Sequence, residues 1–206
     1  MRRWVSFLSL AMVLACATPV FAHPQQVPHS HGTEIAVSGF EAGFAHPFGG
    51  LDHLLAMVAV GGLAVMTAGA SHRRWVLPGS FVGGMLLGGV AGLMRLWMPG
   101  VEILVALSVL VLGSLLIGGG KLRIECLPAA IAMFGAAHGY AHGTEMPAIA
   151  APWLHAAGVV TATVMLHGLG MAAGIGAARR PVLRLPLRLS GAAIAMAGLW
   201  MVWQVI

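Results

Sequence analysis

Six apolar segments, each close to the length of a membrane-spanning helix, constrain the fold of this 206-residue chain more than any other feature. A helix that crosses the hydrocarbon core of a bilayer needs roughly 20 predominantly apolar residues. Short gaps separate the segments, so consecutive helices are expected to be antiparallel neighbours. The sequence therefore predicts an all-α, polytopic membrane protein with six transmembrane helices. The segments lie at about 46–69, 75–97, 101–119, 124–142, 152–177 and 187–206.

The composition agrees with a lipid environment. Only 8% of the residues are charged and 59% are hydrophobic, whereas a soluble domain carries roughly 25% charged residues. The net charge of +5 would suggest a nucleic-acid partner if the basic residues clustered on a soluble surface. They lie instead in the short gaps between the apolar segments. The lipid bilayer is therefore the expected surroundings, and no nucleic acid is expected as a partner.

The first 22 residues have the three parts of a secretory signal peptide, which predicts a signal peptide over 1–22. Arg2 and Arg3 supply the positive charge, residues 5–17 form a short apolar stretch, and residues 20–22 provide small side chains at a cleavage site. The alternatives are an uncleaved first transmembrane helix and a lipoprotein signal.

A polar arm is predicted to follow the signal over residues 23–45, and it carries His23, His29 and His31. These histidines either collect metal ions in the periplasm or belong to an ordinary linker. The remaining residues, 46–206, are predicted to form the six-helix transmembrane domain.

The positions of the basic residues set the orientation in the membrane. Cleavage of the signal leaves the new N-terminus outside, so the loops at 70–74, 118–123 and 178–188 should face the cytoplasm. Those loops hold eight of the nine basic residues that follow the signal, and Arg95 is the exception. This distribution obeys the positive-inside rule. We expect a bacterial inner-membrane protein whose mature N-terminus and C-terminus are both periplasmic.

The first apolar segment contains a cluster of ionisable residues, which are costly inside a membrane and indicate function. On one continuous helix, residues seven apart share nearly the same face, which would align His46 with His53. Asp52 could border the same cavity. Two imidazoles and a carboxylate suit nickel, cobalt or zinc. Met57, one turn further, could add a sulfur ligand or belong to the core.

The fourth apolar segment contains a second cluster. If the helix continues to Glu145, the spacing of four and three residues places His138, His142 and Glu145 on one face. The two-histidine spacing resembles that of zinc peptidases, but Tyr140 and Ala141 stand where those enzymes have their general base. The zinc-peptidase motif is therefore incomplete, which argues against a protease.

Both clusters fall in the outer half of the predicted membrane domain. Glu102 begins the third apolar segment and His155 the fifth, on the same side. His167 lies 12 residues after His155, about 18 Å deeper along a helix. It is either a relay toward the cytoplasm or a hydrogen bond between helices. Metal binding and proton relay are both compatible with the clusters.

The two clusters resemble the motifs of the HupE/UreJ family of membrane proteins linked to hydrogenase and urease. Within 16 residues, the first motif matches at His46, Pro47, Gly50, Asp52, His53, Met57, Val60 and Gly61. The second matches at His138, Gly139, Ala141, His142, Gly143, Glu145 and Pro147. The resemblance extends to the signal, the outer N-terminus and the six helices. It implies a nickel (sometimes cobalt) permease that feeds the maturation of nickel enzymes.

The resulting hypothesis is a secondary permease or facilitator for Ni²⁺, with Co²⁺ or Zn²⁺ as alternatives and no prosthetic group. Hydrogenase or urease maturation proteins are the implied partners. The predicted metal ligands are His46, Asp52, His53, His142 and Glu145, with Glu102 and His138 assisting and His167 on the inward path. Protonation of the histidines should release the metal, so uptake is expected to fall in mild acid.

Two other functions compete with transport. Three protein ligands and an activated water could form an intramembrane zinc hydrolase for a lipid-type substrate, with Asp52 or Glu145 as general base. A metal-binding accessory protein that does not transport is the third hypothesis.

Overall fold

The computed structural model describes residues 39–69, 71–119, 125–146 and 152–206. The predictions for the signal peptide and for the histidines of the arm fall outside these residues.

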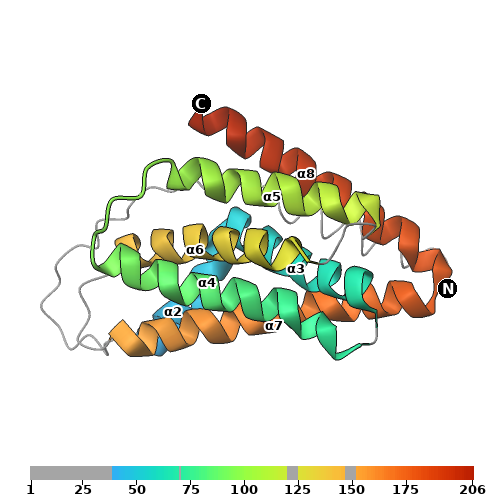
Figure 1. The fold of residues 1–206 in the computed structure, drawn as a ribbon, viewed down its shortest axis with the longest axis horizontal. Helices are drawn as coiled ribbons and strands as arrows, with labels where there is room; N and C mark the ends of the chain where they lie inside the picture. Colours follow the sequence, from blue (N-terminus) through green and yellow to red (C-terminus); the bar gives the residue numbers. More distant parts are fainter. Residues whose placement is uncertain (1–38, 70, 120–124, 147–151) are drawn as a thin grey trace, which may run out of the picture. The chain divides into compact units, whose positions relative to one another are not determined.

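Every regular element in the described part of the chain is a helix, which confirms the all-α prediction (Figure 1). The long helices are α2 (Gly39–Gly49), α3 (Leu51–Ala68), α4 (Val76–Leu93), α5 (Val101–Gly118), α6 (Leu127–Glu145), α7 (Pro152–Arg179) and α8 (Arg184–Val205). Two short 3-10 helices, η1 (His72–Trp75) and η2 (Pro181–Leu183), lead directly into α4 and α8.

Five helical stretches in the described residues are long and apolar enough to cross a membrane: α3, η1 with α4, α5, α7, and η2 with α8. The protein is therefore a multi-pass membrane protein. Helix α6 has 19 residues, one more than α5, but its second half carries His138, His142 and Glu145. These polar residues lower its hydropathy below that of the other five. A sixth span formed by α6 remains a prediction.

The first apolar segment is not one helix, and this corrects the predicted alignment of His46 with His53. Helix α2 ends at Gly49 and α3 begins at Leu51, with Gly50 between them in an extended conformation (φ −106°, ψ 118°). Two successive glycines are poor helix formers, and they break the helix here. His46 and His53 consequently lie on different helices. Helix α2 also begins at Gly39, so the last residues of the predicted arm are helical.

Helix α3 is the most buried of the five stretches, and it packs against α7 and α5. Its side chains Met57, Val60 and Leu63 are fully buried and form the core together with residues from the surrounding helices. Met57 thus has the core position that was one of its two predicted roles. The neighbouring helices contribute Phe81, Leu112, Ile131 and Leu166 to this core, among other residues.

Helices α4 and α6 touch through their backbones along most of their length (Figure 1). A Cβ atom on Gly84 or Gly88 of α4 would collide with a carbonyl oxygen of α6, and one on Gly135 or Gly139 would collide with a carbonyl oxygen of α4. Small residues permit this close approach between membrane helices. The contact fixes the part of α6 that carries both of its histidines.

Helix α7 makes the same kind of contact with α2 and α3. A Cβ on Gly43 of α2 would collide with the backbone of His155, and one on Gly61 of α3 with the backbone of His167. In return, Gly158 and Gly170 of α7 face carbonyl oxygens of α2 and α3. These close approaches fix the positions of α2 and α3 along α7, and with them the positions of the histidines that these helices carry.

Candidate metal site

Five histidines from four helices form a continuous row of ring contacts. Helix α7 contributes His155, α2 contributes His46, α3 contributes His53, and α6 contributes both His142 and His138. The distances between successive ring centroids are 5.8 Å for His155–His46, 4.7 Å for His46–His142, 4.3 Å for His142–His53 and 4.6 Å for His53–His138. The two sequence clusters therefore meet in space, and His155 joins them.

Most of this row is buried. His53, His138, His142 and His155 are each at most 8% exposed, whereas the His46 side chain is 32% exposed. Buried polar atoms in proteins normally have a hydrogen-bond partner. Six ring nitrogens of the row have none among the described residues: His53 Nε2, His138 Nδ1, and both nitrogens of His142 and His155. Such a concentration of buried, unpaired nitrogens is costly for folding alone.

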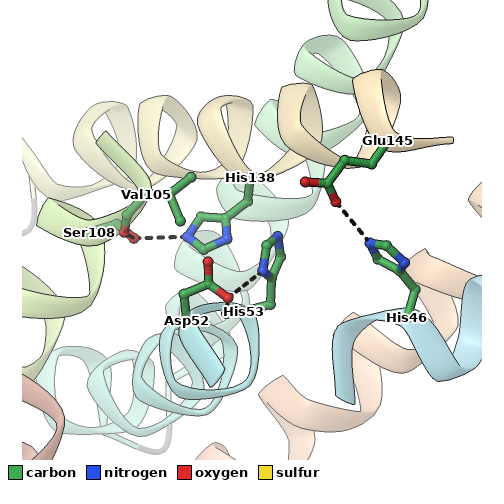
Figure 2. Close-up of polar contacts among 7 residues, drawn as sticks. All are labelled: His46, Asp52, His53, Val105, Ser108, His138 and Glu145. Carbon is green, nitrogen blue, oxygen red and sulfur yellow. Dashed lines mark hydrogen bonds and ion pairs between the residues drawn. The ribbon is translucent and has the colours of Figure 1, made fainter. Parts of the chain in front are cut away.

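Asp52 is bound to its neighbour in sequence (Figure 2). Its Oδ1 accepts hydrogen bonds from the Nδ1–H of His53 at 2.7 Å and from the backbone N–H of His53 at 2.8 Å. Because the carboxylate accepts at Nδ1, the lone pair of the neutral ring lies on Nε2. Gly50 leaves room for this pair, since a Cβ there would lie 2.7 Å from the Asp52 oxygen. Asp52 is thus placed to orient His53.

Glu145 joins the more exposed end of the row. Helix α6 continues to this residue, as the one-face prediction required. The Glu145 Oε2 atom lies 3.6 Å from Nε2 of His46 (Figure 2), and the carboxylate side chain is 62% exposed. A carboxylate and a half-buried histidine therefore form the accessible end of the row.

A serine that the sequence reasoning missed contacts the other end of the row. Ser108 of α5 is fully buried, and its Oγ lies 2.8 Å from Nε2 of His138 (Figure 2). A serine within an apolar helix carries no signal in a single sequence, because such hydroxyls usually bond only to their own backbone.

His167 lies beyond the row and bonds to the backbone of another helix. Its Nδ1–H donates to the carbonyl oxygen of Met57 at 2.7 Å. The Phe81 ring contacts both His167 and His138, at centroid distances of 5.3 Å and 5.5 Å. The helix-packing role predicted as one alternative for His167 is therefore present, with Phe81 beside it.

Glu102 is not brought to the row. It is exposed in the first turn of α5 and makes no hydrogen bond or ion pair with the described histidines. Its predicted assisting role has no support from the geometry.

The row is not a closed metal cage. No three His, Cys, Asp or Glu side chains in the described ranges are arranged to hold one metal ion together. A small cavity of about 110 Å³ between α4, α6 and α7 reaches His142 and His155. Its other walls are apolar and include Met85, Val90 and Val159.

The apolar helices define a multi-pass membrane protein, and its helices enclose a buried row of histidines. This chain belongs to the HupE/UreJ family, since the family described as "HupE / UreJ protein" matches residues 10–201. It is 37% identical over 187 residues to "Protein HupE" of Rhizobium leguminosarum bv. viciae, covering 89% of this chain and 91% of that protein. No solved structure matches. The resemblance found in the two motifs is confirmed.

Proposed function

We propose that this protein is a secondary permease or facilitator that carries Ni²⁺, or the related Co²⁺, across the inner membrane for the maturation of a nickel enzyme. The observation that carries the proposal is the row of five histidine rings with six buried, unpaired nitrogens in the described part of the chain. Imidazole nitrogen is a good ligand for nickel and cobalt. Membership of the HupE/UreJ family supports the same conclusion.

The ion would enter at the exposed end of the row. The Glu145 carboxylate and His46 are the accessible groups there, and a carboxylate offsets the charge of an ion that is losing its water. Successive rings then lie less than 6 Å apart. An ion can exchange one nitrogen for the next without being released into lipid.

The open arrangement suits transport better than storage. A pathway must bind an ion well enough to admit it and weakly enough to release it. Neighbouring histidines that offer one nitrogen each satisfy this condition, whereas a cage of three or four fixed ligands would retain the metal. The absence of a ready-made cage among the described residues agrees with this function.

His142 is the residue on which the proposal depends most. It is the common neighbour of His46 and His53, and neither of its nitrogens has a partner in the described structure. The test is uptake of radioactive nickel by cells without other nickel importers. Intact protein should accumulate nickel, His142→Ala should not, Asp52→Ala should accumulate it only at raised nickel concentration, and His72→Ala, which changes an exposed residue of η1, should transport normally. Uptake by intact protein no better than an empty vector would overturn the proposal.

One observation favours an intramembrane zinc hydrolase as the second candidate. The apolar cavity that reaches His142 and His155 could take a lipid chain. Against it, Asp52 is bound to His53 and Glu145 lies beside His46, so neither carboxylate stands free as a general base. Purified, zinc-loaded protein that hydrolyses lipid amides or esters would establish the hydrolase. Vesicles that bind nickel without accumulating it would indicate an accessory protein instead.

A further inference from the structure

The hydroxyl group of Ser108 makes two short contacts inside the helix bundle. Its Oγ lies 2.6 Å from the carbonyl oxygen of Val105, one turn earlier in α5, and 2.8 Å from Nε2 of His138 on α6. Ser108 and His138 are both fully buried. No water is needed to complete either contact, so the bonding at Nε2 is set by protein atoms.

The direction of these two hydrogen bonds follows from the atoms involved. A carbonyl oxygen only accepts, so the single hydroxyl hydrogen of Ser108 is donated to Val105. The Ser108 oxygen must then accept from His138, which requires a hydrogen on Nε2. A neutral imidazole carries one hydrogen, so the lone pair of His138 lies on Nδ1. That nitrogen is buried and has no partner among the described residues.

The lone pair fixed in this way faces the next ring of the row. Figure 2 shows one nitrogen of His138 turned to Ser108 and the other on the side of the ring nearer His53. The two rings are 4.6 Å apart and nearly perpendicular, with an interplanar angle of 89°. His53 gives its own Nδ1–H to Asp52, which leaves its lone pair on the buried Nε2.

We propose that Ser108 is a positioning residue of the metal path. It holds His138 in the tautomer whose Nδ1, together with Nε2 of His53, can bind a divalent first-row transition-metal ion. This inference rests on the proposed function. Histidines that bind metals usually donate their other N–H to a carboxylate or a carbonyl, and that partner sets the tautomer. The Asp52 carboxylate is this hydrogen-bond acceptor for His53, and the Ser108 hydroxyl is the acceptor for His138.

His167 follows the same rule deeper in the structure. Its Nδ1–H is given to the Met57 carbonyl, and its Nε2 is buried without a partner among the described residues. Three histidines on three helices thus have one nitrogen anchored by an acceptor and the other unpaired. In each case the acceptor comes from α3 or α5.

The test compares Ser108→Ala with Ser114→Ala. Ser114 lies on the same helix, and its hydroxyl also donates to a backbone carbonyl, that of Leu110 at 2.7 Å, but it is exposed and contacts no histidine. Ser108→Ala removes one buried atom and should fold. We expect the apparent KM for nickel uptake to rise about 10- to 100-fold, as for other partners of metal-binding histidines, with a smaller change in maximal rate. Ser114→Ala should leave both unchanged.

A metal-free measurement separates this proposal from nickel transport itself. Nitrogen NMR of protein with isotope-labelled histidine, in lipid bilayers, distinguishes the two neutral tautomers, and the His138 signals are identified by their loss in His138→Ala. Intact protein and Ser114→Ala should show hydrogen on Nε2 of His138, and Ser108→Ala should show a mixture or the other tautomer. An unchanged tautomer in Ser108→Ala, or a changed tautomer with an unchanged KM, would overturn the role of Ser108. Intact protein that shows the expected tautomer but takes up no nickel would overturn only the proposed function.

Discussion

The rings of His53 and His142 lie 4.3 Å apart between their centroids, although the residues belong to different helices, α3 and α6. His142 also contacts His46 of α2. Removal of its side chain would therefore divide the row into two parts with no ring contact between them.

Replacement of His142 by leucine should separate function from stability. We expect His142→Leu to abolish nickel uptake, because the row is interrupted. The free energy of unfolding should stay within about 1 kcal/mol of the intact value or rise, since two buried nitrogens without partners are removed. Uptake assays and thermal denaturation in detergent check both expectations. Normal transport by this variant would exclude His142 from the path.

Asp52→Asn and Asp52→Ala should differ if the carboxylate acts by orienting His53. Asparagine keeps an oxygen that can accept the Nδ1–H of His53, whereas alanine removes it. We expect an apparent KM for nickel that is moderately raised in Asp52→Asn and raised about 10- to 100-fold or more in Asp52→Ala. Equal losses in the two variants would instead favour Asp52 as a direct metal ligand.

His155→Ala should weaken uptake most at low nickel concentration. His155 contacts His46 at the more exposed end of the row, and both of its nitrogens are unpaired within the described structure. Its loss should impair capture of the ion more than passage, so the apparent KM should rise while the maximal rate changes little. An unaltered concentration dependence would place His155 outside the path.

The glycine contact between α4 and α6 can be tested at two adjacent positions. A Cβ on Gly84 would collide with the Ala132 carbonyl oxygen, whereas a Cβ on Gly83 meets nothing within 4 Å. We expect Gly84→Ala to lower the free energy of unfolding by about 1–3 kcal/mol through overpacking. Gly83→Ala should be neutral or stabilising by up to about 1 kcal/mol. Detergent-titrated unfolding measures both, and equal stabilities would argue against the close approach.

Reporter fusions at the C-terminus decide whether α6 crosses the membrane. With an outside N-terminus, six spans place Ile206 in the periplasm, whereas five spans place it in the cytoplasm. We expect alkaline phosphatase fused after Ile206 to be active and the same enzyme fused after Arg180 to be inactive. A fluorescent protein should give the reverse pattern. Activity only at Arg180 is the result expected for five spans, and it would contradict the prediction that α6 crosses the membrane.

The sequence was a good guide to which residues come together and a poor guide to how they do so. Apolar length predicted the membrane helices, and the cost of ionisable groups in lipid pointed to His46, His53, His138 and His142. Spacing, however, defines a face only within one helix. It could not show that Gly50 ends one helix and starts another, and it therefore assigned His46 and His53 to a common face incorrectly.

Contacts between helices were the part that one sequence could not supply. Ser108 bonds to a histidine 30 residues away, and His155 joins a cluster from three other helices because glycines let α2 approach α7. Glu102 has the right chemistry and the right predicted depth, yet its exposed position keeps it from the described histidines. The sequence showed which side chains could bind a metal ion. Which of them come into contact depended on how the helix backbones pack.

The glycine contacts also divide the histidines between two sets of closely packed helices. His46, His53 and His155 belong to α2, α3 and α7, which are joined through backbone contacts, and His138 and His142 belong to α6, which is joined in the same way to α4. Bending within either set is opposed by helices that already touch. Three of the four ring contacts in the row join a histidine of one set to a histidine of the other. If one set moved along the other, all three of these ring contacts would therefore change together, and each imidazole would face a new partner.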